Sequence, residues 1–79
     1  MREQVFHADV VSGEQHVRLV VANGVDGWLA AVYYPDTKES INLHEAPEVE
    51  EAKAVVEDWV RVVHNVRESI EWIPGSPSS

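Results

Sequence analysis

Three side chains near the N-terminus have the chemistry to hold a metal ion. His7 and Asp9 lie two residues apart in one alternating segment, and His16 lies in the next. In a hairpin of strands we expect all three on one face. Two imidazoles and a carboxylate with open positions suit zinc or iron, but Asp beside His on paired strands is also an ordinary surface ion pair. We therefore predict no cofactor and keep the three as metal candidates only. His44 and His64 stand apart and are read as surface residues.

The residues needed for common catalytic chemistries are not set in their usual patterns. There is no cysteine, and Ser12, Ser40 and Ser69 do not stand in a nucleophile-elbow sequence. Asn23-Gly24 and Asp26-Gly27 read as turns, because no helix pattern follows them as a phosphate-binding loop would require. We predict that the protein is not an enzyme and has no catalytic residues.

The charge balance bears on the class of partner. The 79 residues contain 14 Asp and Glu against six Lys and Arg, a net charge of −8. Nucleic acids and anionic membranes require clustered cations, so we expect neither as a partner. No apolar run approaches the ~20 residues of a membrane span, and the first residues lack the apolar segment of a signal peptide. With no cysteine, these observations favour a cytoplasmic protein.

A group of carboxylates surrounds the start of the predicted helix: Glu45, Glu48, Glu50 and Glu51. Such a group can imitate phosphates and dock on a basic groove. Acidic residues in the first turn also complement the helix dipole, and this alternative needs no partner.

The elements that position these groups begin with two alternating segments, 3–11 and 15–22. A hairpin through Ser12-Gly13, with Val11 opposite Glu14, puts apolar residues together on one face: Phe6, Ala8, Val10, Val17, Leu19 and Val21. The register also places Asp9 opposite His16.

Two further strands follow, at 28–34 and 40–43. Pairing Ala22 with Trp28 predicts that Leu29, Ala31 and Tyr33 face the core. The short fourth strand, which contributes Ile41 and Leu43, is expected at a sheet edge.

A long helix is predicted from Glu48 to Ile70, with Pro47 at its first position. Apolar residues recur there three and four positions apart: Val49, Ala52, Val56, Trp59, Val63, Val66 and Ile70, flanked by Val55, Val60 and Val62. The fold class expected is α+β, a four-stranded antiparallel β-meander with one long C-terminal α-helix packed on one face (β-β-β-β-α). We expect one domain over 1–73 and a disordered tail over 74–79.

The predicted arrangement leaves the other face of the sheet uncovered. Its apolar residues form the expected partner-binding surface: Val5, Val20, Trp28, Ala30, Val32 and Tyr34. A different register, or Trp72-Ile73 folding back, would remove this surface. If it exists, Trp28→Glu should disrupt association and leave the monomer folded.

A local resemblance adds to this interpretation. Gly27-Trp28-Leu29-Ala30-Ala31-Val32, Pro35-Asp36 and a helix with Glu50-Glu51-Ala52 resemble the antitoxin half of HicA–HicB pairs, which use a β-β-β-α module. The chain lacks that family's Pro-Gly-Cys turn and its DNA-binding segment. The resemblance implies a similar sheet–helix construction and favours a protein-binding role.

The function predicted is therefore a small soluble non-catalytic protein-interaction module. It would bind itself, as a homodimer, or another protein through the open sheet face. The alternative is a small acidic inhibitor, of the type that phages encode, that occupies a basic nucleic-acid-binding groove of a target protein.

Overall fold

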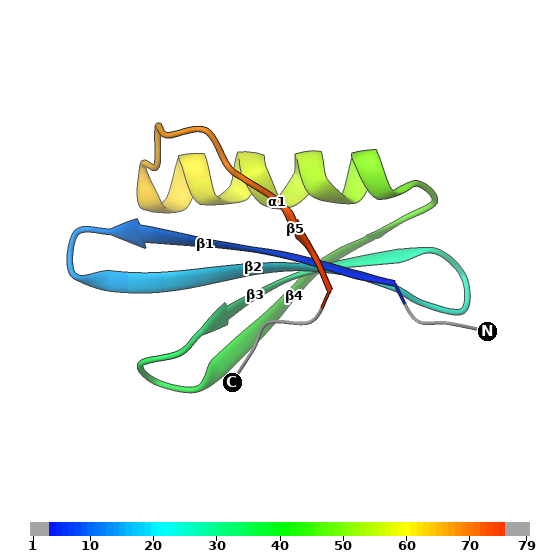
Figure 1. Ribbon diagram of the computed structural model, residues 1–79, viewed down its shortest axis with the longest axis horizontal. Helices are drawn as coiled ribbons and strands as arrows, with labels where there is room; N and C mark the ends of the chain where they lie inside the picture. Colours follow the sequence, from blue (N-terminus) through cyan, green and yellow to red (C-terminus); the bar gives the residue numbers. More distant parts are fainter. Residues whose placement is uncertain (1–3, 76–79) are drawn as a thin grey trace.

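The computed structural model describes residues 4–75 and contains one antiparallel sheet with a helix on one face (Figure 1). The elements, in chain order, are β1 (Val5–Ser12), β2 (Gln15–Asn23), β3 (Trp28–Tyr34), β4 (Glu39–Ala46), α1 (Val49–His64) and β5 (Ile73–Pro74). The strand order in the sheet is β4-β3-β2-β1-β5. The predicted β-β-β-β-α class is confirmed, and β5 is an addition to it.

The first hairpin pairs two residues away from the predicted register. The turn is Gly13-Glu14, with Gly13 at a φ of 62°, so Ser12 lies opposite Gln15 and Ala8 opposite Leu19. Because side chains alternate with a period of two, a shift of two leaves every residue on its predicted face. Ala8, Val17, Leu19 and Val21 are accordingly fully buried.

The register of the second hairpin, β2 with β3, differs by one residue from the prediction, so the two faces of β3 are exchanged. Asn23, not Ala22, lies opposite Trp28. The Asn23 N–H donates to the Gln4 carbonyl (2.8 Å), which extends β2 by one residue, and the Gly24 N–H closes the loop on the Gly27 carbonyl (2.6 Å). The prediction for β3 was therefore wrong, because Ala30 and Val32 are fully buried beneath α1 and the intervening residues face outward.

The edge strand β4 is longer than predicted and contains a bulge. Ala30 pairs with His44 and Ala31 with Asn42, so Leu43 is the additional residue. Leu43 packs at the margin of the core, whereas Ile41 is 41% exposed. The position of β4 at the sheet edge agrees with the prediction.

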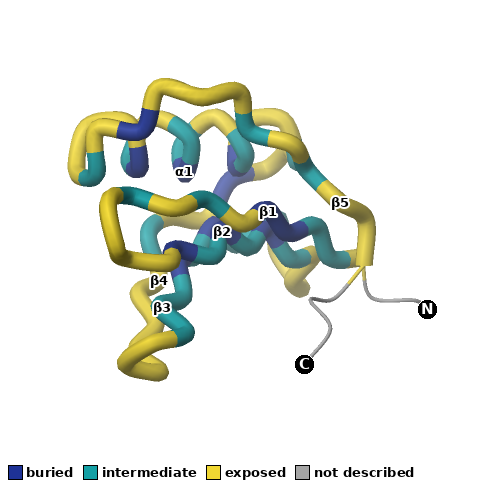
Figure 2. Tube along the Cα trace, turned by 60° about the vertical axis from the view of Figure 1, so that its left-hand side comes forward, coloured by how far each residue is buried: buried dark blue, intermediate teal, exposed yellow. Residues whose placement is uncertain are grey.

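The helix α1 covers the sheet through Ala52, Val56 and Val60, which are all fully buried. Figure 2 shows that the buried parts of α1 lie on the side of the helix that faces the sheet. The helix ends at His64 rather than Ile70, because Asn65 adopts the left-handed conformation at φ 55°. Val62 and Val63, predicted to pack on the sheet, are exposed. The N-cap is Glu48, so Pro47 precedes the helix rather than beginning it.

The remaining residues, 65–75, form a mostly irregular segment that ends in β5 and that we call the strap. It runs from the end of α1 to β1 (Figure 1), and Val66, Ile70 and Trp72 pack against the core from it. Val66 and Ile70 therefore reach the core without being helical. The Trp72 indole N–H donates to Glu57 Oε2 (2.7 Å), which ties the strap to the helix.

The end of the strap joins the sheet. Ile73 and Pro74 pair with His7 and Phe6, and the Gly75 N–H donates to the Val5 carbonyl (2.7 Å). Pro74 and Gly75, which were predicted to belong to a disordered tail, pair with β1 in the structure. The other residues of that tail, 76–79, lie outside the described residues.

Candidate functional site: the outer face of the sheet

The face of the sheet opposite α1 carries a continuous group of apolar side chains. The strand register sets them in three rows, of which the middle one contains Val20 and Ala31. Val5, Ala22 and Leu29 form the row on one side, and Tyr33 lies in the row on the other. We call these six residues the outer-face patch: Val5, Val20, Ala22, Leu29, Ala31 and Tyr33. All six are half-buried, and none belongs to the core. Within residues 4–75, no helix or loop crosses this face (Figure 1).

Only two of the six predicted partner-binding residues lie on this surface. Val5 and Val20 do, whereas Trp28, Ala30, Val32 and Tyr34 are on the core side of β3. The Trp28 ring packs 6.0 Å from that of Phe6, centroid to centroid. These four were misplaced because the shift of one residue in the second hairpin turns each of them to the other face.

Their neighbours Leu29, Ala31 and Tyr33 supply the apolar surface instead. The two faces of β3 are almost equally apolar, so the sequence pattern of this strand alone does not select between them. The face of β3 depends on the length of the loop between β2 and β3. Gly24, Asp26 and Gly27 are all suited to a turn, so the sequence did not show at which residue this loop begins.

Charges on the outer face are few and largely compensated. Arg18 Nε contacts Asp9 Oδ1 at 2.9 Å, and both side chains are partly exposed. His7, only 9% exposed, has Nδ1 2.8 Å from the Gly75 carbonyl oxygen, so this nitrogen carries the donated proton. Glu45 lies beside Leu29 at one corner. The middle of the patch is therefore free of formal charge.

The structure does not bring the three metal candidates together. Asp9 lies opposite Arg18 rather than His16, because the first hairpin pairs two residues away from the predicted register. His16 lies opposite Val11, and its backbone N–H is 3.5 Å from Asp36 Oδ2. Over residues 4–75, no three His, Asp or Glu side chains are grouped so that they could hold a metal ion.

The four carboxylates predicted as an acidic docking site are all exposed near the start of α1. Glu50 contacts Lys53 Nζ at 3.7 Å. That ammonium lies 4.3 Å from the centre of the Phe6 ring, so the lysine is held over β1 as well. Glu45, Glu48 and Glu51 remain open to a partner.

A cluster at the other end of α1 was not predicted from the sequence. His64 Nε2 is 2.9 Å from the Tyr34 hydroxyl, and the imidazole packs edgewise against Tyr34 and Trp59. Burial, followed by the nearby Glu39 carboxylate, raises the pKa of the Tyr34 phenol. His64, read as a surface residue from its isolation in the sequence, is thus a packing residue at the helix end.

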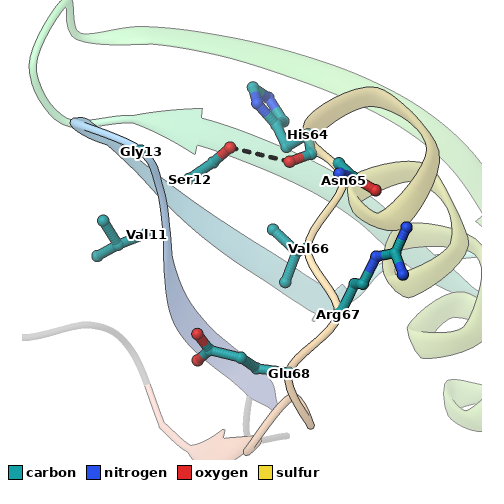
Figure 3. A pocket seen from close by; sticks show the side chains of 8 residues that line it. All are labelled: Val11, Ser12, Gly13, His64, Asn65, Val66, Arg67 and Glu68. Atoms are coloured by element: carbon teal, nitrogen blue, oxygen red, sulfur yellow. Dashed lines mark hydrogen bonds between the residues drawn. The ribbon is translucent and has the colours of Figure 1, made fainter.

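Beside this cluster lies a cleft of about 450 Å³ between the first hairpin and the strap (Figure 3). Val66 points into it from the strap. The Ser12 hydroxyl donates to the His64 carbonyl (2.9 Å), and the His64 ring points away from the cleft. Ser12 and His64 are therefore not arranged as a nucleophile and its base, which would require the imidazole to face the hydroxyl.

Comparisons with known proteins do not place the chain in a family. No protein-family model matches it, and neither the curated proteins nor the solved structures contain a match. Of the helices in the described part of the chain, none has the length and apolar character to cross a membrane.

Proposed function

We propose that this protein is a small, non-catalytic, cytoplasmic interaction module that binds through the outer-face patch, to a second copy of itself or to another protein. The single observation that supports this most is the apolar surface on the uncovered side of the sheet. Contiguous exposed apolar surface of this kind is typical of protein interfaces, in which aromatic residues are enriched and charges are depleted at the centre. Tyr33, Leu29 and the uncharged middle row meet this description.

The energetic gain from covering the patch is moderate. Full burial of a side chain such as Leu or Val contributes ~1.5–3 kcal/mol. Each patch residue is already half-buried, so about half of that remains available on binding. Val5, Val20 and Leu29 can each supply such a contribution, and the two alanines supply less. After the loss of rotational and translational freedom is offset, the sum is consistent with a weak complex rather than a very tight one.

The test compares Leu29→Glu with Val62→Glu. Leu29 lies on the patch, whereas Val62 is 83% exposed on α1, on the other side of the molecule. Both changes add one negative charge at an exposed or half-exposed position, so their difference reports the surface rather than the net charge. Association is measured by sedimentation for the protein alone and by titration for a candidate partner.

We expect Leu29→Glu to abolish association and Val62→Glu to leave it unchanged. Association through the patch should also survive ~0.5 M salt, because apolar contacts are not screened. Equal effects of the two substitutions would refute the proposal.

A second candidate function, an acidic inhibitor that occupies a basic groove, is supported by the exposure of Glu45, Glu48, Glu50 and Glu51 at one end of the molecule. Its test is the paired change Glu48→Gln and Glu51→Gln. If the acidic group binds the partner, this change and added salt should each weaken binding steeply, while Leu29→Glu has no effect. The reverse pattern would eliminate this alternative.

A further inference from the structure

The distribution of charge indicates which partner suits the outer face. The segment 48–71, which contains α1 and most of the strap, has seven acidic and three basic residues, an excess of four negative charges. The outer face carries the mutually compensated Asp9 and Arg18 and a single further carboxylate, Glu45, at its corner. A basic partner would be attracted to the helix side, whereas the outer face has no charge that would select one.

Two copies of the chain that meet through the outer face keep their acidic helix sides apart. Stacked sheets lie about 10 Å apart, and a helix layer adds a similar distance on each side, so the two acidic layers would be separated by roughly 30 Å. That exceeds the Debye length of about 8 Å at physiological salt. Contact through the helices would instead bring the two acidic layers together.

The part of the patch on β3 and β4 is also complementary to itself. Consider a twofold axis that lies between the two sheets, runs perpendicular to the strands and follows the middle row. This axis places Val20 and Ala31 each opposite the same residue of the second copy. The same axis reverses the other rows, so the Tyr33 row meets the row that contains Leu29. The Tyr33 row also contains Arg18 and Asp9, and the axis places this ion pair over Ala22 and Val5 of the second copy, at one side of the interface. Small side chains at the centre allow close approach, and each aromatic ring packs on a leucine. Ser40, beside Tyr33, would lie over Glu45 of the second copy and can donate to its carboxylate.

We therefore infer that a second copy of this chain occupies the outer face, packed sheet to sheet about a twofold axis through Val20 and Ala31, with Tyr33 of each copy on Leu29 of the other. This inference rests on the proposed function and names its partner. Aligned packing of two twisted sheets at about 30° is the geometry that β-sandwiches use. The result is a four-layer assembly of helix, sheet, sheet and helix.

The size of the patch sets the expected affinity. A standard interface buries about 800 Å² on each partner, which is a large share of the 5476 Å² exposed by this small chain. Three rows across four strands cover less than that, so we expect a dissociation constant in the micromolar range, which corresponds to roughly −8 kcal/mol. Sedimentation should accordingly show a concentration-dependent monomer–dimer equilibrium that reaches mainly dimer by ~100 μM.

The absence of cysteine makes the geometry directly testable. Ala31→Cys puts a thiol at the proposed axis, next to its own symmetry mate. Ala54→Cys puts one on the exposed side of α1 and serves as the matched control. Treatment with a short bismaleimide should link Ala31→Cys chains at least about tenfold faster than Ala54→Cys chains, since effective concentration favours the paired thiols.

Orientation is tested by mixing Leu29→Cys with Tyr33→Cys. The proposed axis brings these two positions together, so the mixture should cross-link faster than either variant alone. Faster linking of each variant with itself would indicate an axis along the strands and overturn the arrangement. A chain that remains monomeric at ~100 μM, with Ala31→Cys linking no faster than Ala54→Cys, would overturn the dimer.

Failure of this inference and failure of the proposed function give different results. If the wild type is monomeric but Leu29→Glu, unlike Val62→Glu, loses binding to another protein, the dimer is wrong and the interaction surface stands. If the wild type dimerises and Leu29→Glu does not weaken the dimer, the patch is not the interface and both are wrong.

Discussion

Neighbouring alanines on β3 provide the sharpest test of the sheet register. Ala30 is fully buried on the core side, opposite Val21, whereas Ala31 is half-buried on the outer face, opposite Val20. The two residues have the same type, lie in the same strand and are adjacent in the chain. Ala30→Glu and Ala31→Glu therefore differ essentially in the face to which the new carboxyl points.

The expected costs follow from burial. At Ala30 the new carboxyl would lose its ionisation or strain the core. Even the neutral form lacks a hydrogen-bond partner, at a cost of about 1–3 kcal/mol. The added volume in a packed core costs a further 1–3 kcal/mol or so. The resulting loss of about 2–6 kcal/mol compares with a total stability of roughly 4–12 kcal/mol for a chain of this length. At Ala31 the carboxylate stays in water, and we expect a loss below about 1 kcal/mol.

Thermal unfolding followed by circular dichroism measures the difference. For a domain of this size, 1 kcal/mol corresponds to ~4–8 °C in Tm. Ala30→Glu should lower Tm by at least about 8 °C or leave no folded protein, while Ala31→Glu should lower it by less than about 8 °C. The measurement belongs at low protein concentration, because self-association would add its own stabilisation. If Ala31→Glu were the more destabilising variant, β3 would present its other face to the helix and the register argued above would be refuted.

Three further predictions concern the strap, a phenol and the helix end. Trp72→Phe should remove the indole hydrogen bond to Glu57 and keep most of the packing, at a cost of ~1 kcal/mol. Hydrogen exchange at the amide of His7, which pairs with β5, should become faster than in the wild type. Unchanged exchange would show that Trp72 does not hold β5 on the sheet. The raised pKa of Tyr34 means that folding favours the neutral phenol, so this residue contributes its full stability below its ordinary pKa of 10.0 and loses it as pH rises through the higher folded value. Urea unfolding across that range should show an alkaline loss that Tyr34→Phe lacks, and an identical loss in both proteins would assign it to another group. Asn65 is left-handed, with φ at 55°, a conformation that Gly adopts without strain. Asn65→Gly should therefore keep or slightly raise the stability, whereas Asn65→Ala should cost about 1 kcal/mol. Equal stabilities of the two variants in urea would indicate that the helix does not end through a left-handed residue.

Much of the architecture was predictable because it depends on local periodicity. Alternation in 3–11 and 15–22 specified two strands and the face of each that packs in the core. This prediction survived the register difference of two residues, because a shift of two leaves each side chain on the same face. The apolar spacing at Ala52, Val56 and Val60 specified the buried side of α1. Each of these patterns can be read within a few residues of the chain.

The errors occurred at turns and at the helix end, which the apolar periodicity of the strands and the helix does not specify. Val66 and Ile70 fit the helical spacing, but Asn65 ends the helix and the strap brings both to the core by another path. The metal candidates required Asp9 to lie opposite His16, and the turn at Gly13-Glu14 places Arg18 there instead.

The sequence by itself determined the strands, the helix and the acidic character of the helix side, because these follow from residue types and their spacing. The tertiary structure decided which face of β3 the helix covers, and hence that Leu29, Ala31 and Tyr33, rather than Trp28, Ala30 and Val32, face outward. The physical reason is that both faces of this strand are apolar. The observed register is accompanied by the hydrogen bond from Asn23 to Gln4 and by closure of the loop between Gly24 and Gly27, and a shift of one residue exchanges the interior for the surface.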